Sequence, residues 1–537
     1  MTSRQKFFPY TLFTLTVLVA SVLFPAVASA QNQDAADDDR PNILFIMSDD
    51  HAAHAVGAYD GRLSELNPTP NLDRLAEEGM RMDNVFAGNS ICVPARATFI
   101  TGQYSHTHGL RTLAGGMPPK RQALFNEIND AGYNTAAIGK WHLKRKPAAD
   151  YYAVLPGQGN YFNPLLRVKG NGEWPNNTRR FAGYNSLHSS DVITGQSLDW
   201  LKEQEEQDDP FFMYLGYKAP HDNFENAERH DWLYDDVHIP EPASLWLRGE
   251  HGPAGRDRYG TSIGRRNQRR NMGHHMHVPQ DLNDRRYKRT AYQRYLKKYL
   301  RCVKAIDEGV GRVIDHLKQT GQLNNTVIFY TSDQGMMLGE HDYIDKRWMY
   351  EESIRMPFLV RYPERVEPGS SSDALIHNVD IAPTVLDLAG IDAPDSMEGR
   401  SMTPILTGNG TPDDWRDAIY YRYWFHMAHH DNPAHFGIRT KRYKLIFFYG
   451  LWLDARGGQK KHKPEDAYWE LYDLKEDPNE QYNVYHDPAY RDVVKRLTRK
   501  LIEKKKAVGD TDAQYPRVRK RFRKTSIVDF SEKNLWD

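Results

Sequence analysis

Short apolar runs alternate with amphipathic stretches between about residues 41 and 400. The clearest run is NILFIM at 42–47, which is typical of a strand covered on both faces. Further strand-like runs lie at 134–138, 211–217, 326–331 and 357–362. Helical patterns lie at 71–79, 95–101, 197–207, 287–318 and 381–388. This alternation predicts an α/β fold with a mostly parallel central sheet flanked by helices.

The pattern changes after about residue 400. Aromatic, strand-like runs are closely spaced at 418–424, 437–439 and 443–449, and a basic helix is expected at 489–506. These features predict a smaller antiparallel sheet with a helix on it. We therefore expect a main α/β domain at 41–400 and a C-terminal α+β subdomain at 401–537.

The first thirty residues have the pattern of a signal peptide. Arg4 and Lys6 precede an apolar stretch at about 10–27, and Ala28-Ser29-Ala30 provides a small-residue cleavage site. An uncleaved anchor helix is the alternative, but Pro25 and the small-residue exit favour cleavage. We expect a signal peptide at 1–30, a flexible acidic leader at 31–40, and an exported protein, periplasmic or secreted, without stable membrane insertion.

Composition narrows the class of protein. The 537 residues include 71 Lys and Arg against 71 Asp and Glu, so net charge gives no reason to expect nucleic acid as a partner. Hydrophobic residues make up 39% and charged residues 26%, which excludes a disordered or multi-span membrane chain. Two cysteines exclude a disulfide scaffold and a cysteine-based zinc cluster.

The stretch 249–286 is richer in basic residues than the chain as a whole. It has little periodicity and contains Arg265, Arg266, Arg269, Arg270, His274, His275 and His277. It is either a solvated insertion loop, an electrostatic lip for a sulfated or carboxylated polymer, or a histidine-rich metal site. The sequence leaves these three alternatives open.

Chemically useful side chains follow four of the predicted strands. In open α/β sheets, ligands bind beyond the carboxyl ends of the strands. The residues at these ends are Asp49, Asp50, Lys140, His142, His221, Asp333 and Gln334. Acids with an amide oxygen suit a hard divalent cation, whereas Lys and His suit an anionic substrate and its leaving group. Each alone has an ordinary alternative, such as a helix cap, a turn or a hydrogen-bonded histidine.

The segment Cys92-Val93-Pro94-Ala95-Arg96 has the pattern C-x-P-x-R, and GYNTAAIGKWH follows at 132–142. With these motifs the chain resembles the type I, formylglycine-dependent sulfatases of the alkaline phosphatase superfamily. The resemblance covers about residues 41–485. Its other matching segments are Ser48-Asp49-Asp50, Thr101-Gly102, Ala219-Pro220-His221, Ser332-Asp333-Gln334-Gly335 and Lys346. It implies an alkaline-phosphatase-like fold and a sulfuric ester hydrolase.

The resemblance implies that Cys92 is oxidised to formylglycine by a formylglycine-generating or anaerobic sulfatase-maturing enzyme. One hydroxyl of the aldehyde hydrate would attack sulfur, and deprotonation of the other would then expel sulfate. From the residues alone, Cys92 could also be a buried inert thiol or pair with Cys302. Cys302 lies in a predicted helix and is expected to be core.

The resemblance also assigns roles to the other residues. One calcium ion would be bound by Asp49, Asp50, the modified Cys92, Asp333 and Gln334. Gln334 replaces the Asn or His common at its position but keeps an amide oxygen. Arg96 would hold the hydrate, and the sulfate oxygens would be bound by Lys140 and Lys346. His221 would protonate the leaving alcohol, and His142 would act as a base.

The overall pattern looks like bacterial polysaccharide sulfatases related to iduronate-2-sulfatase. We therefore expect a sulfated carbohydrate as substrate, of the ulvan, carrageenan or glycosaminoglycan type. The stretch 425–442 is either a solvated loop or a polar wall for the sugar, with His426, His429, His430, His435 and Arg439. The alternatives are a broad arylsulfatase, a phosphonate or phosphodiester hydrolase, and a non-catalytic polyanion-binding protein with unmodified Cys92.

Overall fold

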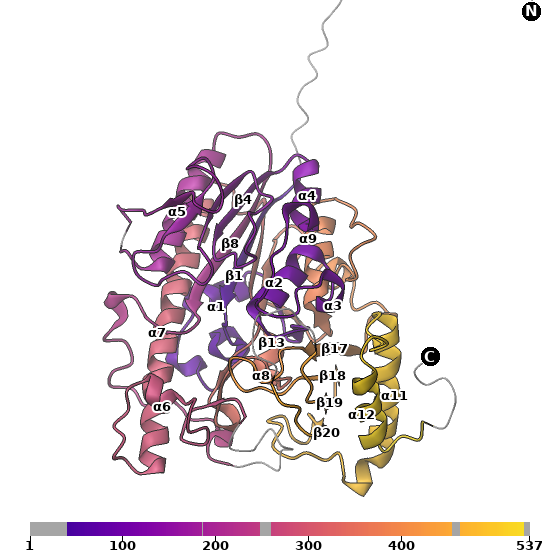
Figure 1. Cartoon of the computed structure of the whole chain (residues 1–537). Coiled ribbons are helices and arrows are strands. Elements are labelled where there is room, and N and C mark those ends of the chain that lie inside the picture. Colours follow the sequence, from indigo (N-terminus) through magenta and orange to yellow (C-terminus); the bar gives the residue numbers. More distant parts are fainter. Residues whose placement is uncertain (1–39, 185, 248–258, 454–461, 531–537) are drawn as a thin grey trace, which may run out of the picture. The chain divides into compact units, whose positions relative to one another are not determined.

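The computed structural model describes residues 40–184, 186–247, 259–453 and 462–530 (Figure 1). The chain from Arg40 onward forms one compact unit. The predicted signal peptide, and the leader up to residue 39, lie outside the described residues. Within the described ranges, none of the helices combines the length and the apolar character needed to cross a bilayer. The predicted domain boundary at 400 stays a prediction.

A mostly parallel central sheet is confirmed. Over the described ranges it has ten strands, in the order β15 (Ser370–Ser372), β2 (Met80–Met82), β14 (Phe358–Arg361), β10 (Thr326–Ser332), β1 (Asn42–Asp49), β8 (Phe211–Pro220), β4 (Asn134–Gly139), β5 (Tyr151–Val154), β6 (Leu166–Val168) and β7 (Thr178–Arg179). The neighbours β10, β1, β8 and β4 are mutually parallel. The strand expected at 357–362, β14, runs antiparallel to β10.

Helices cover both faces of this sheet (Figure 1). Alternate residues of β1 enter two different cores, because successive strand side chains point to opposite faces. Ile43, Phe45 and Met47 pack with α2 (Cys92–Thr101), α4 (Ala123–Asp130) and α9 (Ile381–Leu388). Leu44 and Ile46 pack with α1 (Pro70–Glu77), α5 (Ser189–Gln204) and α7 (Asp284–Gln319). The continuous apolar run therefore reflects burial on both sides.

Two of the predicted helices, at 197–207 and 287–318, are present with different agreement at their starts. Helix α5 begins at Ser189, eight positions before the predicted 197, and the side chain of His188 accepts a hydrogen bond from the backbone N–H of Ser190. Its first turns are polar yet buried, so hydrophobic periodicity does not mark them. The long helix predicted at 287–318 is confirmed as α7.

The smaller antiparallel sheet is also confirmed. Its strands are β17 (Ala418–Tyr423), β18 (His435–Thr440), β19 (Tyr443–Phe448) and β20 (Tyr468–Asp473). Helices α11 (Arg491–Ala507) and α12 (Pro516–Thr525) pack on one face of it through a shared apolar core. The other face packs against the segment around Trp348 and Tyr350. Strand β20 and helix α12 were not among the predicted elements.

Candidate active site

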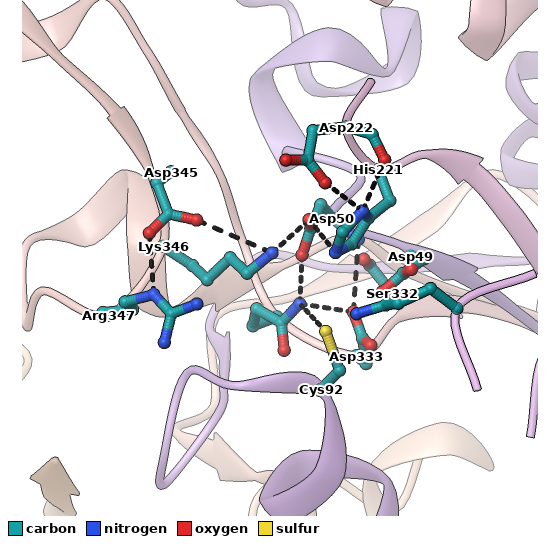
Figure 2. Close-up of polar contacts among 12 residues, drawn as sticks. Asp49, Asp50, Cys92, His221, Asp222, Ser332, Asp333, Asp345, Lys346 and Arg347 are labelled. Atoms are coloured by element: carbon teal, nitrogen blue, oxygen red, sulfur yellow. Dashed lines mark hydrogen bonds and ion pairs between the residues drawn. The ribbon is translucent and has the colours of Figure 1, made fainter. Parts of the chain in front are cut away.

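Four parallel strands deliver their following residues to one edge of the sheet. Asp49 ends β1, Asp333 follows β10, His221 follows β8 and Lys140 follows β4. Because these strands are neighbours and parallel, their carboxyl ends meet. Figure 2 shows Asp49, Asp333 and His221 converging, with Cys92 facing them from the start of a helix. The structure thus brings together side chains that the sequence marked separately.

Cys92 is the first residue of α2, which begins three positions before the predicted 95. Ile91 before it is extended, and Gly102 ends the helix with φ 64°, a conformation that glycine adopts at little cost. Cys92 is only 1% exposed, and burial raises the pKa of its thiol. The thiol is therefore protonated near neutral pH and is a weak nucleophile. Cys92 and Cys302 are both free thiols, and Cys302 is core, as expected.

Three buried carboxylates lie opposite Cys92. Asp49, Asp50 and Asp333 each offer one oxygen, and these oxygens lie within 4.8 Å of one another. The left-handed backbone of Asp50, at φ 66°, places its N–H 3.2 Å from Oδ1 of Asp333. Burial raises the pKa of the Asp50 carboxyl, although Lys346 opposes that shift. Crowded buried carboxylates of this kind gain stability from a bound cation.

The donor set fits a hard divalent cation. Asp49 Oδ1 and Gln334 Oε1 are buried acceptors that receive no hydrogen bond from any described residue. The amide nitrogen of Gln334 instead donates to Asp333 Oδ1 at 2.6 Å and also to Asp50. An amide held by its nitrogen leaves its oxygen available. Carboxylate and amide oxygens are the ligands that calcium and magnesium prefer.

Arg96 lies in α2 and donates hydrogen bonds to three other residues of the site. Its Nε donates to Asp333 Oδ2 at 2.9 Å, and its Nη1 donates to the Lys140 carbonyl at 2.8 Å and to the Tyr214 hydroxyl at 2.6 Å. Its Nη2 lies 3.7 Å from Asp49 Oδ1 and makes no hydrogen bond to a described residue. One side of the guanidinium is therefore fixed, while Nη2 has no hydrogen-bond acceptor among the described residues.

Two lysines reach the same centre, although burial lowers the pKa of Lys140 well below its usual value. Lys140 forms a buried ion pair with Asp49. Lys346 Nζ lies 2.5 Å from Asp50 Oδ2 (Figure 2). Although burial opposes it, Asp50 helps to raise the pKa of Lys346, which keeps this ammonium charged. Lys346 follows β12 (Tyr343–Asp345), in the segment that packs on the small sheet.

The two histidines differ in their surroundings. His221 Nε2 lies 3.7 Å from Asp50 Oδ2, and its Nδ1 lies 2.6 Å from Asp222 Oδ1. Burial, Lys346 and Lys140 lower the pKa of His221. His142 is buried with φ 58°, and its Nδ1 has no hydrogen-bond partner in the described chain. Burial and then Lys140 lower its pKa well below the usual value, so this ring is neutral near neutral pH.

Sequence reasoning missed two residues here. Tyr214 lies inside β8, where an alternating aromatic position carries no functional signal. Asp222 directly follows His221 and is the carboxylate that orients it. That adjacency was a usable signal, because a neighbouring acid commonly fixes a histidine ring.

A cavity of about 910 Å³ lies beside this cluster. Five of the seven basic residues noted in 249–286 line it, namely Arg269, Arg270, His274, His275 and His277. Arg265 and Arg266 instead pair with Asp284 and Asp342. The described groups with metal-binding geometry include none of these histidines.

The histidines of 425–442 differ in where their side chains lie. His430 lines the cavity, and its Nδ1 lies 3.0 Å from Asp345 Oδ2. His435 is fully buried among the aromatic rings of the small sheet, and Arg439 pairs with Glu351. His426 contacts the Lys463 carbonyl. Of the residues expected to form a polar wall, only His430 lines this cavity.

Comparison with known proteins identifies the family. The sulfatase family model matches residues 41–391, and a model described as N-sulphoglucosamine sulphohydrolase, C-terminal, matches residues 339–507. An N-acetylglucosamine-6-O-sulfatase of Bacteroides thetaiotaomicron is 36% identical over 531 residues, covering 91% of this chain and 90% of that protein.

Comparison with solved structures also finds similar proteins. One protein, solved in complex with its substrate D-glucosamine-2-N,6-O-disulfate, has a TM-score of 0.77 at 35% identity, covering 89% of this chain and 99% of that one. A phosphonate monoester hydrolase from Silicibacter pomeroyi has a TM-score of 0.68 at 24% identity, covering 87% of this chain and 95% of that one, a likeness of fold alone. The chain therefore belongs to the sulfatase family, as a type I sulfatase of the alkaline phosphatase superfamily and a sulfuric ester hydrolase.

Proposed function

We propose that this sulfatase hydrolyses sulfate esters on carbohydrates, with the 6-O-sulfate of a glucosamine-type sugar as the first substrate to test. The observation that carries the proposal is the convergence of three carboxylates, two ammonium groups and Cys92 at one sheet edge. The sugar assignment rests on the 36% identical N-acetylglucosamine-6-O-sulfatase and on the relative solved with a glucosamine disulfate.

We propose that Cys92 is converted to formylglycine by a maturation enzyme. The buried thiol, with its raised pKa, is poorly suited to attack sulfur itself. The hydrate of the aldehyde would supply a hydroxyl nucleophile at this position, and its second hydroxyl would allow sulfate to be released. Nη2 of Arg96, which makes no hydrogen bond to a described residue, would hold an oxygen of residue 92.

A calcium ion would be held by Asp49, Asp50, Asp333 and Gln334, together with an oxygen of the modified residue 92. Two acceptors that receive no hydrogen bond from described residues, Asp49 Oδ1 and Gln334 Oε1, support this assignment. When bound, the ion would withdraw charge from the sulfate oxygens. It would also compensate the three carboxylates, which leaves the lysine charges available to the substrate.

The remaining side chains bind the sulfate and move protons. Lys140 and Lys346 bind sulfate oxygens and exclude water from them. His221 Nε2 faces the centre and donates its proton to the leaving alcohol oxygen, while Asp222 fixes the ring through Nδ1. His142, neutral and with an unpartnered Nδ1 among the described residues, accepts a proton from residue 92 when sulfate leaves.

The test is a turnover comparison with enzyme co-expressed with a maturation partner. Hydrolysis is measured for N-acetylglucosamine 6-sulfate, 4-nitrophenyl sulfate and a phosphonate monoester. We expect kcat/KM to be highest for the sulfated sugar. Preference for the aryl sulfate would instead indicate a broad arylsulfatase, and preference for the phosphonate would indicate a phosphonate hydrolase.

We also propose export, on the basis of the signal-peptide pattern at 1–30. A polymeric sulfated substrate does not cross a membrane readily, so an exported enzyme would meet it directly. N-terminal sequencing of the protein from the periplasm or medium of its host should begin at Gln31. A start at Met1 in a membrane fraction would contradict export with cleavage.

A further inference from the structure

The cavity beside the cluster is strongly basic. Six lysines and arginines line it, against three carboxylates, Asp222, Glu225 and Asp235. Its volume, about 910 Å³, lies within the range of small-molecule binding sites. The proposed mechanism uses none of these lysines and arginines.

Four of the basic residues that line the cavity lie on one face of α7. Arg294, Lys297, Lys298 and Arg301 occupy positions i, i+3, i+4 and i+7 and therefore share one helix face. The opposite face, with Tyr295 and Tyr299, is buried. Like charges at these spacings repel one another and weaken a helix. A stripe of four cations facing a cavity is therefore best explained by an anionic occupant.

The local partners leave positive charge available. Arg301 pairs with Asp235 at 2.5 Å, and Arg294 donates to the Met276 and His277 carbonyls, which do not neutralise it. Lys298 is exposed, and among the described residues no carboxylate oxygen lies within 4.0 Å of its Nζ.

Arg269 and Arg270, which also line the cavity, share a single carboxylate. Their guanidinium groups lie 3.7 and 3.6 Å from Asp431 Oδ2. The side chain of Arg269 is 80% exposed. This wall therefore also carries more positive than negative charge, and the two basic walls face one cavity from different parts of the chain.

The cavity adjoins the place where the leaving group must lie. Asp222 lines it and orients His221, which we assign as the donor to the leaving oxygen. His430 also lines it and contacts Asp345, the neighbour of Lys346. Figure 2 shows Asp222 and Asp345 on the same side of the cluster as His221 and Lys346. The saccharide attached to the leaving oxygen would therefore extend into the basic cavity.

We infer that this cavity is a second anion subsite, which binds a sulfate or carboxylate carried by the same saccharide as the ester that is cleaved. The inference rests on the proposed carbohydrate function. It makes the enzyme selective for sugars with at least two anionic groups. The second group would be either a sulfate on the same sugar or the carboxylate of a neighbouring uronic acid.

Three substrates distinguish these sources. They are N-acetylglucosamine 6-sulfate, glucosamine N,6-disulfate, and a uronic acid–N-acetylglucosamine 6-sulfate disaccharide. Matured enzyme should hydrolyse at least one of the last two with kcat/KM about tenfold or more above the first, since a charge-assisted contact contributes that much. Preference for the disulfate assigns the second sulfate, and preference for the disaccharide assigns the carboxylate.

The ratio of kcat/KM for the preferred two-anion substrate to kcat/KM for N-acetylglucosamine 6-sulfate is then measured in variants. Lys298→Ala and Arg270→Ala should each lower it about threefold or more, and Lys298→Arg should retain it. Lys318→Ala is the matched control, because Lys318 lies on the same helix, about 30 Å away at 1.5 Å per residue. The melting temperature of each variant verifies folding, and the charge-retaining Lys298→Arg separates charge from packing.

Failure of this inference is distinguishable from failure of the proposed function. If sulfated sugars are hydrolysed but the ratio stays near one, or is unchanged in both alanine variants, the second subsite is overturned and the carbohydrate function stands. If none of the three sugars is hydrolysed while 4-nitrophenyl sulfate is, both are overturned.

Discussion

Arg96 and Asp333 are 237 positions apart in the sequence, yet Arg96 Nε lies 2.9 Å from Asp333 Oδ2. Both side chains are about 1% exposed. Their ion pair connects the helix that carries Cys92 to the strand end that carries the proposed cation ligands. The position of Cys92 relative to Asp333 therefore depends on this pair.

Arg96→Met should remove activity and destabilise the fold. It leaves Asp333 buried without its cation partner, a change that commonly costs about 3–5 kcal/mol. Tyr214→Phe is the matched control, since it removes one hydrogen bond to the same guanidinium and one to the Lys140 carbonyl, about 1 kcal/mol each. Urea unfolding and sulfate release measure the two effects. Equal stability losses in both variants would contradict the role given to the ion pair.

Cys92→Ala should abolish turnover and leave the melting temperature nearly unchanged, because a small buried side chain is replaced by a slightly smaller one. In the wild-type protein from its native host, peptide mass spectrometry should show that residue 92 has lost sulfur and gained oxygen. An intact thiol in fully active protein would refute the formylglycine mechanism.

Removal of the cation should lower both activity and stability. Chelator treatment followed by dialysis should lower the melting temperature, and calcium should restore it, since a ligand at 100 times its Kd stabilises the native state by about 2.7 kcal/mol. Gln334→Met, which lacks the acceptor oxygen, should weaken calcium binding in calorimetry. Gln204→Met, at another buried glutamine, should not. A calcium affinity unaffected by Gln334→Met would exclude this ligand.

The two histidines should respond differently to the leaving group. His221→Ala should slow hydrolysis of a sugar sulfate by about 10²–10⁴, because an alkoxide leaves poorly without a proton donor. It should slow 4-nitrophenyl sulfate much less, because that phenolate leaves unprotonated. His142→Ala should slow both substrates alike. If His142→Ala shows the leaving-group dependence instead, the two assignments must be exchanged.

Asp307 on α7 should stabilise the start of α1. Its Oδ1 accepts hydrogen bonds from the backbone N–H groups of Asn71 and Leu72, at 2.9 and 3.0 Å. Asp307→Ala leaves these donors buried without a partner and should cost about 1–3 kcal/mol in urea unfolding. Asp307→Asn keeps an acceptor oxygen and should cost less. Similar losses in the two variants would argue against this capping role.

Much of the site follows from local sequence. A doubly buried strand is recognisable from NILFIM at 42–47, and the residue after it is then near the sheet edge. Strand periodicity places Asp49, Asp333 and His221 at strand ends, and the parallel pairing of β1 with β10 and β8 brings these ends to one edge. The C-x-P-x-R motif likewise marks Cys92 and Arg96 by their spacing alone.

Other features carry no such signal. Tyr214 looks like any core aromatic of β8, and the polar first turns of α5 look like a loop until packing buries them. The spacing of the basic residues in α7 shows that they share one helix face. The sequence does not show that this face lines the same cavity as Arg270.

The sequence by itself indicated the central strands of the sheet and the side chains that follow them, because strand periodicity and short motifs are local properties. Only the tertiary structure decided which residue orients His221, which oxygens are left for a cation, and which basic side chains share one cavity. Those relationships join segments up to hundreds of residues apart, and they are fixed by packing rather than by any local pattern.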